Sequence, residues 1–157
     1  MSAQLRLRYL VVQAEWGALA EGGGGDALDP AAAGPSDLFQ ALRATHQELF
    51  GDAGWGAVAP ALAVTYYSAA SRLAVVRCPA AAEEAVRAAL ALTRAVRRRA
   101  VALHTLQCVG TVRGLREALA RVTRGVAGAL RGAQATAGVQ LGNDFFEALE
   151  REALECL

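Results

Sequence analysis

The chain has 157 residues, with 16 basic and 15 acidic side chains and a formal net charge of +1 at pH 7. This length predicts one domain that buries roughly 68–70% of the surface of the unfolded chain. No apolar stretch approaches the roughly 18 residues of a membrane span, and the N-terminus lacks signal-peptide and transit-peptide patterns, so we expect a soluble protein with no membrane partner. Three cysteines without a CxxC pair argue against a disulfide framework and a local zinc site, namely Cys78, Cys108 and Cys156.

The charges are unevenly distributed along this nearly neutral chain. Between Arg72 and Arg131, twelve arginines stand against three acidic residues, a local net charge of +9, and each flank carries a net charge of −4. All sixteen basic residues are arginine. A basic block of this kind predicts a surface that binds a polyanion.

The first third of the chain predicts a strand, an insertion and a helix. Residues 5–14 alternate apolar and basic side chains and then become continuously apolar, which is typical of a central strand. Residues 17–36 contain four consecutive glycines and two prolines, and we interpret them as a flexible insertion. Residues 36–50 have apolar side chains at helical spacing, and Gly51 predicts the end of that helix.

Two β-prone runs and a basic helix follow. A Gly-rich turn around Trp55 leads to residues 58–67 and 72–78, which predict a hairpin closed by Pro79. Residues 80–99 are alanine-rich with acidic residues early and arginines late, the charge order that favours a helix.

The last third predicts a strand and two helices. Residues 101–109 read as a strand, residues 111–131 as a helix, and residues 132–157 as a small-residue linker with a short acidic amphipathic helix. The order β-α-β-β-α-β predicts an α+β, ferredoxin-like fold, with the topology of an RNA-recognition motif, two helices on one face of the sheet and an added C-terminal helix. We expect residues 1–131 to form this domain.

The junction between the last predicted strand and helix has the features of an anion site. Gly110 and Thr111 precede a helix whose first N–H groups lack intrahelical partners. Arg113 and Arg116 lie within its first turns, so the junction predicts a phosphate-binding turn.

Helical periodicity gathers arginines on one side of each basic helix. On the helix over 111–131 the charged side is opposite the apolar side, and its members are Arg113, Arg116, Arg121, Arg124 and Arg131. On the helix over 80–99, the arginines that share one side are Arg87, Arg94 and Arg98, with Arg97 and Arg99 crowding its end. These faces either bind phosphates or are simply solvated, and three adjacent arginines favour contact with a nucleic acid.

Other chemistry has little support in the sequence. The third predicted strand lacks the aromatic RNP pattern, so stacking of single-stranded bases on the sheet is rejected. His46 has core spacing, and His104 is about 13 Å from Cys108 along a strand, too far for a catalytic pair. There is no Walker loop, HExxH motif or carboxylate pair. We predict no catalytic residues, no metal ligands and no cofactor, and hence a protein that is not an enzyme by itself.

Three segments resemble a known family. The segments are residues 6–10 (RLRYL), 73–78 (LAVVRC) and 105–113 (TLQCVGTVR). They look like the processing-of-precursor subunit five family, which comprises small protein subunits of archaeal and eukaryotic ribonuclease P and of ribonuclease MRP. The resemblance covers roughly residues 5–120, interrupted by the insertion, and its most specific part is the Gly-Thr-Val-Arg turn.

The resemblance implies a ferredoxin-like, non-catalytic subunit of a ribonucleoprotein. Its partners would be ribonuclease P RNA or MRP RNA, precursor tRNA within the complex, a TIM-barrel-like protein subunit of about thirty kilodaltons and a small paralogous subunit. The holoenzyme RNA, using Mg²⁺, would remove 5′ leaders from precursor tRNA or process rRNA in the nucleus and nucleolus.

Combining the arginine block with the resemblance gives a set of expected RNA contacts. They are Arg6, Arg8, Arg94, Arg97, Arg98, Arg99, Gly110, Thr111, Arg113 and Arg116. Two other functions stay open: a ferredoxin-like small-molecule enzyme of acyl or phosphoryl transfer, and an adaptor that binds only proteins.

Overall fold

The structure is a computed structural model of the chain that describes residues 6–19, 28–137 and 143–155. The elements are β1 (Leu7–Leu19), α1 (Pro35–Val58), β2 (Ala63–Ser68), β3 (Leu73–Pro79), α2 (Glu83–Leu92), β4 (Ala95–Val96), β5 (Arg99–Val109), α3 (Val112–Ala137) and α4 (Asn143–Glu155). Short 3-10 turns, Pro30–Ala32 and Ala80–Ala82, precede α1 and α2. None of the helices in these described ranges is long and apolar enough to cross a membrane.

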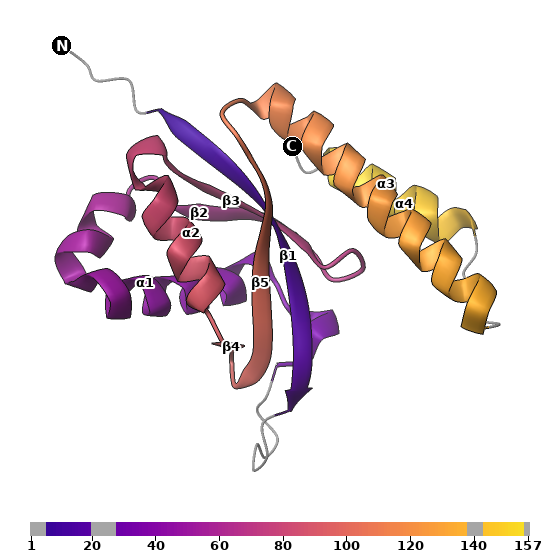
Figure 1. Cartoon of the computed structure of the whole chain (residues 1–157), viewed down its shortest axis with the longest axis horizontal. Helices are drawn as coiled ribbons and strands as arrows, with labels where there is room; N and C mark the ends of the chain where they lie inside the picture. The colour runs from indigo at the N-terminus through magenta and orange to yellow at the C-terminus, as the bar shows by residue number, and fades with distance from the viewer. Residues whose placement is uncertain (1–5, 20–27, 138–142, 156–157) are drawn as a thin grey trace.

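The strands form one antiparallel sheet in the order β2-β3-β1-β5-β4 (Figure 1). β1 is central, and its Leu10 lies opposite Val76 of β3 and Cys108 of β5. Apart from the two-residue β4, this is the predicted ferredoxin-like order. The fold class is therefore confirmed.

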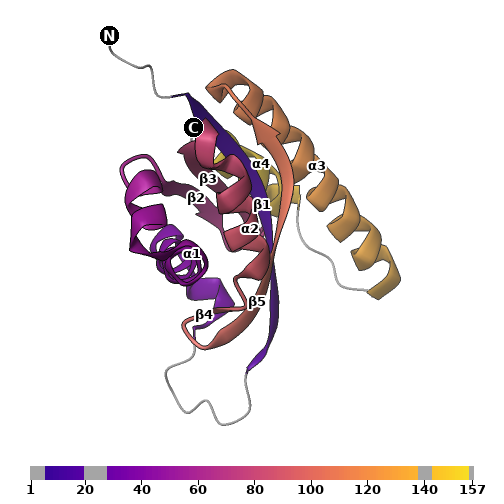
Figure 2. The ribbon, with the colours of Figure 1, turned by 60° about the vertical axis from the view of Figure 1, so that its left-hand side comes forward.

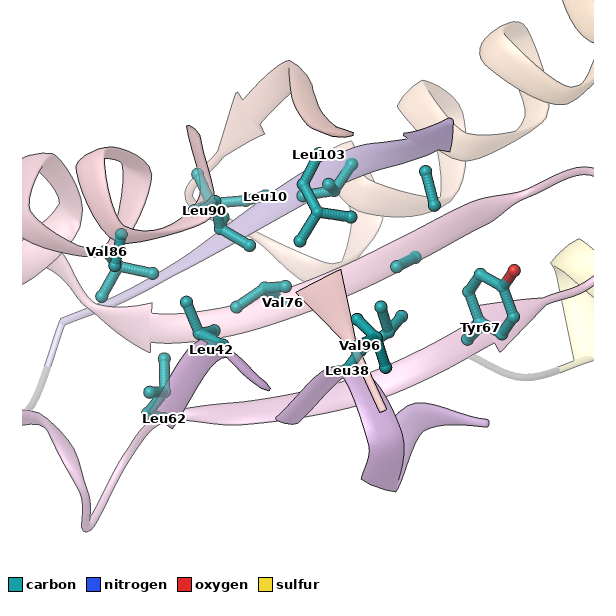
Figure 3. Close-up of a cluster of buried hydrophobic side chains, with 14 of the residues drawn as sticks. Leu10, Leu38, Leu42, Leu62, Tyr67, Val76, Val86, Leu90, Val96 and Leu103 are labelled. Carbon is teal, nitrogen blue, oxygen red and sulfur yellow. The ribbon is translucent and has the colours of Figure 1, made fainter. Parts of the chain in front are cut away.

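Each face of the sheet carries its own apolar cluster, because alternate residues of a strand point to opposite faces. Leu10 and Val12 of β1 pack with α1 and α2 (Figure 3), whereas Val11 packs with Leu115 and Leu119 of α3. Figure 2 shows α1 and α2 on one side of the sheet and α3 on the other. Two helices cover one face of the sheet, as predicted. In addition, α3 covers the other face, which an RNA-recognition motif would use for stacking.

The first helix is longer than predicted. Gly51 has φ of 68° and breaks the helical geometry where the helix was expected to end, but the helix resumes beyond it. Trp55 therefore lies within α1, where it contacts Phe39 edge-on, and β2 begins five residues later than expected, at Ala63. The Gly-rich pattern marks a kink and not a turn between elements.

The helix predicted over residues 80–99 is wrong in its second half. α2 ends at Leu92, because Thr93 has extended backbone angles and its hydroxyl donates to Ala89 O at 2.8 Å. Val96 is then fully buried in the core as part of β4 (Figure 3). Arg97 and Arg98, with φ of 43° and 65°, form the two-residue turn of a β4–β5 hairpin, which requires positive φ at both positions.

The remaining differences concern the segments that link the elements. Residues 132–137, predicted as linker, continue α3, and the rest of that linker, 138–142, lies outside the described residues. Of the predicted insertion, residues 17–19 extend β1 and Leu28 is buried, whereas residues 20–27 lie outside the described residues. The C-terminal helix is present as α4 and packs against α3, where Phe145 lies beside Ala127.

Candidate nucleic-acid interface

The predicted RNA contacts separate into two groups at opposite ends of β5. Figure 1 shows the β4–β5 hairpin and the junction of β5 with α3 at opposite ends of β5. The arginines at 94, 97, 98 and 99 lie in or beside the hairpin. Those at 113 and 116 lie in the first turns of α3, and those at 6 and 8 lie near the junction because Tyr9 pairs with Val109. The eleven residues of β5 extend over about 36 Å at 3.3 Å per residue. The basic block seen in the sequence is therefore divided in the structure between the two ends of β5.

At the hairpin end, two of the four arginines already have partners. Arg97 forms an ion pair of 3.5 Å with Asp37 of α1, and Arg99 Nε donates to Gly17 O at 2.8 Å. Arg94 and Arg98 are exposed and have no ion pair within residues 6–19, 28–137 and 143–155. These two guanidinium groups are the ones available to a phosphate.

At the other end, Thr111 is the N-cap of α3, as predicted. Its Oγ1 accepts from Gly114 N–H at 3.0 Å, and its carbonyl accepts from Leu115 N–H at 2.9 Å. The helix therefore begins at this junction, where Thr111 and Val112 are exposed, and a helix N-terminus favours negative charge.

Arg8 is held beside the same junction. Its guanidinium lies against Gly110, at the position that a Cβ would occupy. Arg8 Nε is 3.5 Å from Glu83 Oε2, and Arg87 Nη1 is 3.6 Å from Glu83 Oε1. One carboxylate is shared by two guanidinium groups, so this cluster keeps a net positive charge. Arg6, two residues before Arg8, is exposed.

α3 presents a basic outer side and an apolar inner side, which confirms the predicted amphipathic pattern. Leu115 and Leu119 are buried against the sheet. Arg116 and Arg121 are exposed and have no ion pair among the residues that the structure describes, and Arg113 pairs with Glu117 at 3.3 Å in a fully solvated contact. Arg121 was not among the expected RNA contacts, although its helical angle relative to Arg113 indicated it.

The cysteine thiols and the buried histidine offer no reactive group beside these arginines. Burial, reinforced by Glu83, raises the pKa of the Cys108 thiol to about 11, and burial likewise raises the pKa of Cys78 to about 11. His46 is buried against Phe50, as its core spacing predicted. Within the described parts of the chain, no three His, Cys, Asp or Glu side chains gather as a metal site.

One family model matches the part of the chain that carries the motifs. The model of the Rpp14/Pop5 family matches residues 8–120. Among solved structures, a chain in the cryo-EM structure of yeast ribonuclease MRP is similar, with a TM-score of 0.48 and 14% identity, covering 71% of this chain and 79% of that chain. No curated protein sequence gives a significant match. Because the family model spans well over half of the chain and includes both the β1 and the Gly110-Thr111 motifs, this protein belongs to the Rpp14/Pop5 family of ribonuclease P/MRP protein subunits.

Proposed function

We propose that this protein binds the structured RNA of ribonuclease P, of ribonuclease MRP, or of both, and stabilises it without supplying catalytic groups of its own. In this role it would help the RNA, with its Mg²⁺, to remove 5′ leaders from precursor tRNA or to process rRNA in the nucleus and nucleolus. A TIM-barrel-like subunit and a small paralogous subunit would complete the protein part of the complex.

The observation that carries the proposal is the set of exposed arginines without ion pairs, within the described residues, at both ends of β5 and on α3. Arg94 and Arg98 mark one end of the strand, and Arg116 and Arg121 lie beyond the other. Guanidinium groups bind phosphate through paired N–H donors. Two groups about 36 Å apart suit the backbone of a folded RNA better than a small anion, which could occupy only one of them.

The face of the sheet that is closed by α3 supports recognition of phosphates and shape over recognition of bases. Val11 and Val75 are buried against Leu119 of α3, so the described part of this face offers no free aromatic platform for stacking. Any recognition of base edges would have to come from residues of the loops, such as the arginines of the β4–β5 hairpin. We therefore expect affinity that depends strongly on salt and little on single-stranded sequence.

The proposal is tested by RNA binding and by cleavage in a reconstituted holoenzyme. Binding of the folded RNA should weaken by about 0.7–0.9 log units per log unit of salt for each phosphate neutralised. Arg98→Gln and Arg116→Gln should each reduce the slope of log affinity against log salt by about the contribution of one phosphate, roughly 0.7–0.9. In the double variant the two reductions should add, because the two sites are far apart.

Arg43→Gln is the matched control, because Arg43 belongs to neither group and its guanidinium stacks over Trp55 and donates to Gln47. It should keep the wild-type slope. Binding that does not depend on salt would contradict the proposal, as would turnover of an acyl or phosphoryl substrate by the isolated protein. Pulldown of protein partners that survives nuclease, with no RNA crosslink to either arginine group, would favour a protein-only adaptor.

A further inference from the structure

β5 is an edge strand whose outer side is open over most of its length. β4 pairs only with Arg99 and Ala100, and Val101 N–H donates to Arg94 O at 3.0 Å. From residue 102 to residue 109, no strand among the described residues pairs with the outer side of β5. This open stretch is about 26 Å long at 3.3 Å per residue.

The backbone groups that point outward can be assigned from the ladder. In an antiparallel strand, alternate residues direct both N–H and C=O to the same side. Since Val101 points outward, Leu103 and Thr105 do so too, while Ala102 and His104 face their partners in β1. Leu103 and Thr105 therefore offer two donors and two acceptors in the spacing that another strand requires.

The usual protections of a strand edge are weak along this stretch. Natural edges are shortened, or carry proline, charged side chains or a bulge. Residues 102–109 contain no proline and no acidic or basic residue other than His104, and Leu106 is 40% exposed. A register shift beside Leu106 interrupts the ladder with β1, which leaves the stretch before it regular. The opposite edge, β2, has only six residues, and three of them are buried.

Two arginines lie along the α2 side of this edge. Arg94 lines a hollow together with Glu15 and Ala102. Arg87, which is 3.6 Å from Glu83, lines a second hollow together with Leu103 and Thr105. Figure 1 shows β5 passing between α2 and α3 at this point. A strand added to the edge would place alternate side chains in front of these guanidinium groups.

We propose that the outer edge of β5 binds an extended acidic segment of a protein partner by strand addition, with carboxylates two or four residues apart reaching Arg87 and Arg94. Main-chain hydrogen bonds to Leu103 and Thr105 supply the affinity, and the arginines supply the specificity.

Charge decides between this occupant and the others. A second copy of the chain, paired edge to edge, would place Arg87 and Arg94 opposite the same residues of its partner, and like charges across an interface are unfavourable. RNA could meet the arginines, but a phosphate backbone cannot both donate to and accept from the alternating peptide groups. An acidic peptide strand satisfies both requirements.

The test measures binding of a capped eight-residue peptide of alternating glutamate and valine to the full chain without RNA. Amide NMR should show protection of Leu103 and Thr105. Thr105→Pro removes one outward N–H without breaking the ladder with β1, and should weaken binding about tenfold. Arg87→Glu should also weaken the glutamate peptide, by roughly three- to tenfold, and should instead favour a lysine–valine peptide.

Circular dichroism and thermal unfolding check that each variant stays folded. As a control, Arg98→Glu at the tip of the hairpin should leave peptide binding unchanged and should weaken RNA binding. Absence of peptide binding, or equal binding by Thr105→Pro, would overturn the proposal. So would protection of the same amides by a structured RNA hairpin, or a dimer of the chain that Thr105→Pro converts to monomer.

Discussion

The guanidinium of Arg8 lies against Gly110, where the side chain of any larger residue would begin. The contact joins the first strand of the family motif to its last turn, across 102 positions of sequence, and holds a positive charge beside the N-terminus of α3. It also explains why glycine is suited to this position, since a Cβ would displace the arginine.

Gly110→Ala tests this contact directly. The atom that a methyl group would meet is the flexible end of Arg8, so the free energy of unfolding should change by less than about 1 kcal/mol. The displaced guanidinium should nevertheless lose its position beside Glu83, with a shift in the Arg8 Nε–H signal and weaker RNA binding. An unchanged Arg8 signal would show that the contact is not formed.

Two other glycines should respond to alanine with opposite signs. Gly128 lies inside α3 with open space at its Cβ position, whereas Gly51 has φ of 68°. Gly128→Ala should stabilise the protein by about 0.5–1 kcal/mol because alanine is the better helix former. Gly51→Ala should destabilise it by about 1 kcal/mol or more because its backbone is left-handed. Urea unfolding measures both, and effects of the same sign would argue against the kink in α1.

The buried His46 should make stability depend on pH. Burial lowers the pKa of His46 below that of an ordinary histidine, and neither ring nitrogen has a hydrogen-bond partner in the described structure. Below about pH 6.5 the unfolded state takes up the proton more readily, so stability is present above this pH and falls as pH decreases.

The loss can be at most about 1.4 kcal/mol per pH unit, because a single proton is involved. Denaturant unfolding between pH 7.5 and 5 should show this loss for the wild type but not for His46→Leu. A His46→Leu variant that keeps the wild-type slope would assign the effect to other groups.

The thiols of Cys78 and Cys108 should react slowly with alkylating reagents. A pKa of about 11 for each leaves a thiolate population at pH 8 that is roughly a hundredfold below that of an ordinary cysteine. In a Cys156→Ser background, modification should follow global unfolding. Glu83→Gln should increase the alkylation rate of Cys108 more than that of Cys78, because the Glu83 carboxylate lies beside Cys108 and helps to raise the pKa of its thiol.

The acidic helix α4 should oppose RNA binding from a distance while it stabilises the fold. It packs Phe145 against Ala127 and Leu130 of α3, and its Glu152 accepts from the hydroxyl of Ser68 at 3.2 Å. Ending the chain at Ala137 removes a net charge of −4 and exposes this apolar patch, which should cost roughly 1–3 kcal/mol of stability.

The truncated chain should bind RNA more tightly at low salt, and the gain should shrink as salt screens the charge. A variant with glutamine at positions 147, 150 and 155 keeps the packing, and should show the tighter binding without the loss of stability. Equal affinity of all three proteins at low salt would contradict a role for the acidic charge.

Local patterns were sufficient for much of this protein. The apolar runs of β1 and β5, the amphipathic α3, the Thr111 cap and the Gly-Thr-Val-Arg turn are written in short-range spacing, and their sum gives the fold class and the family. These features depend on neighbours within one or two turns, which a sequence displays directly.

The tertiary structure decided what became of the arginines. Residues 94–99 read as the end of a helix, but Val96 is buried as part of β4 and makes them a hairpin, which moves Arg98 to the end of β5 that lies farther from α3. Asp37 and Gly17, distant in sequence, occupy Arg97 and Arg99. An ion pair depends on distance in space, so contacts between remote segments determine which arginines remain unpaired. The sequence by itself determined a basic block. The fold divided this block into two sites and left an open strand edge between them.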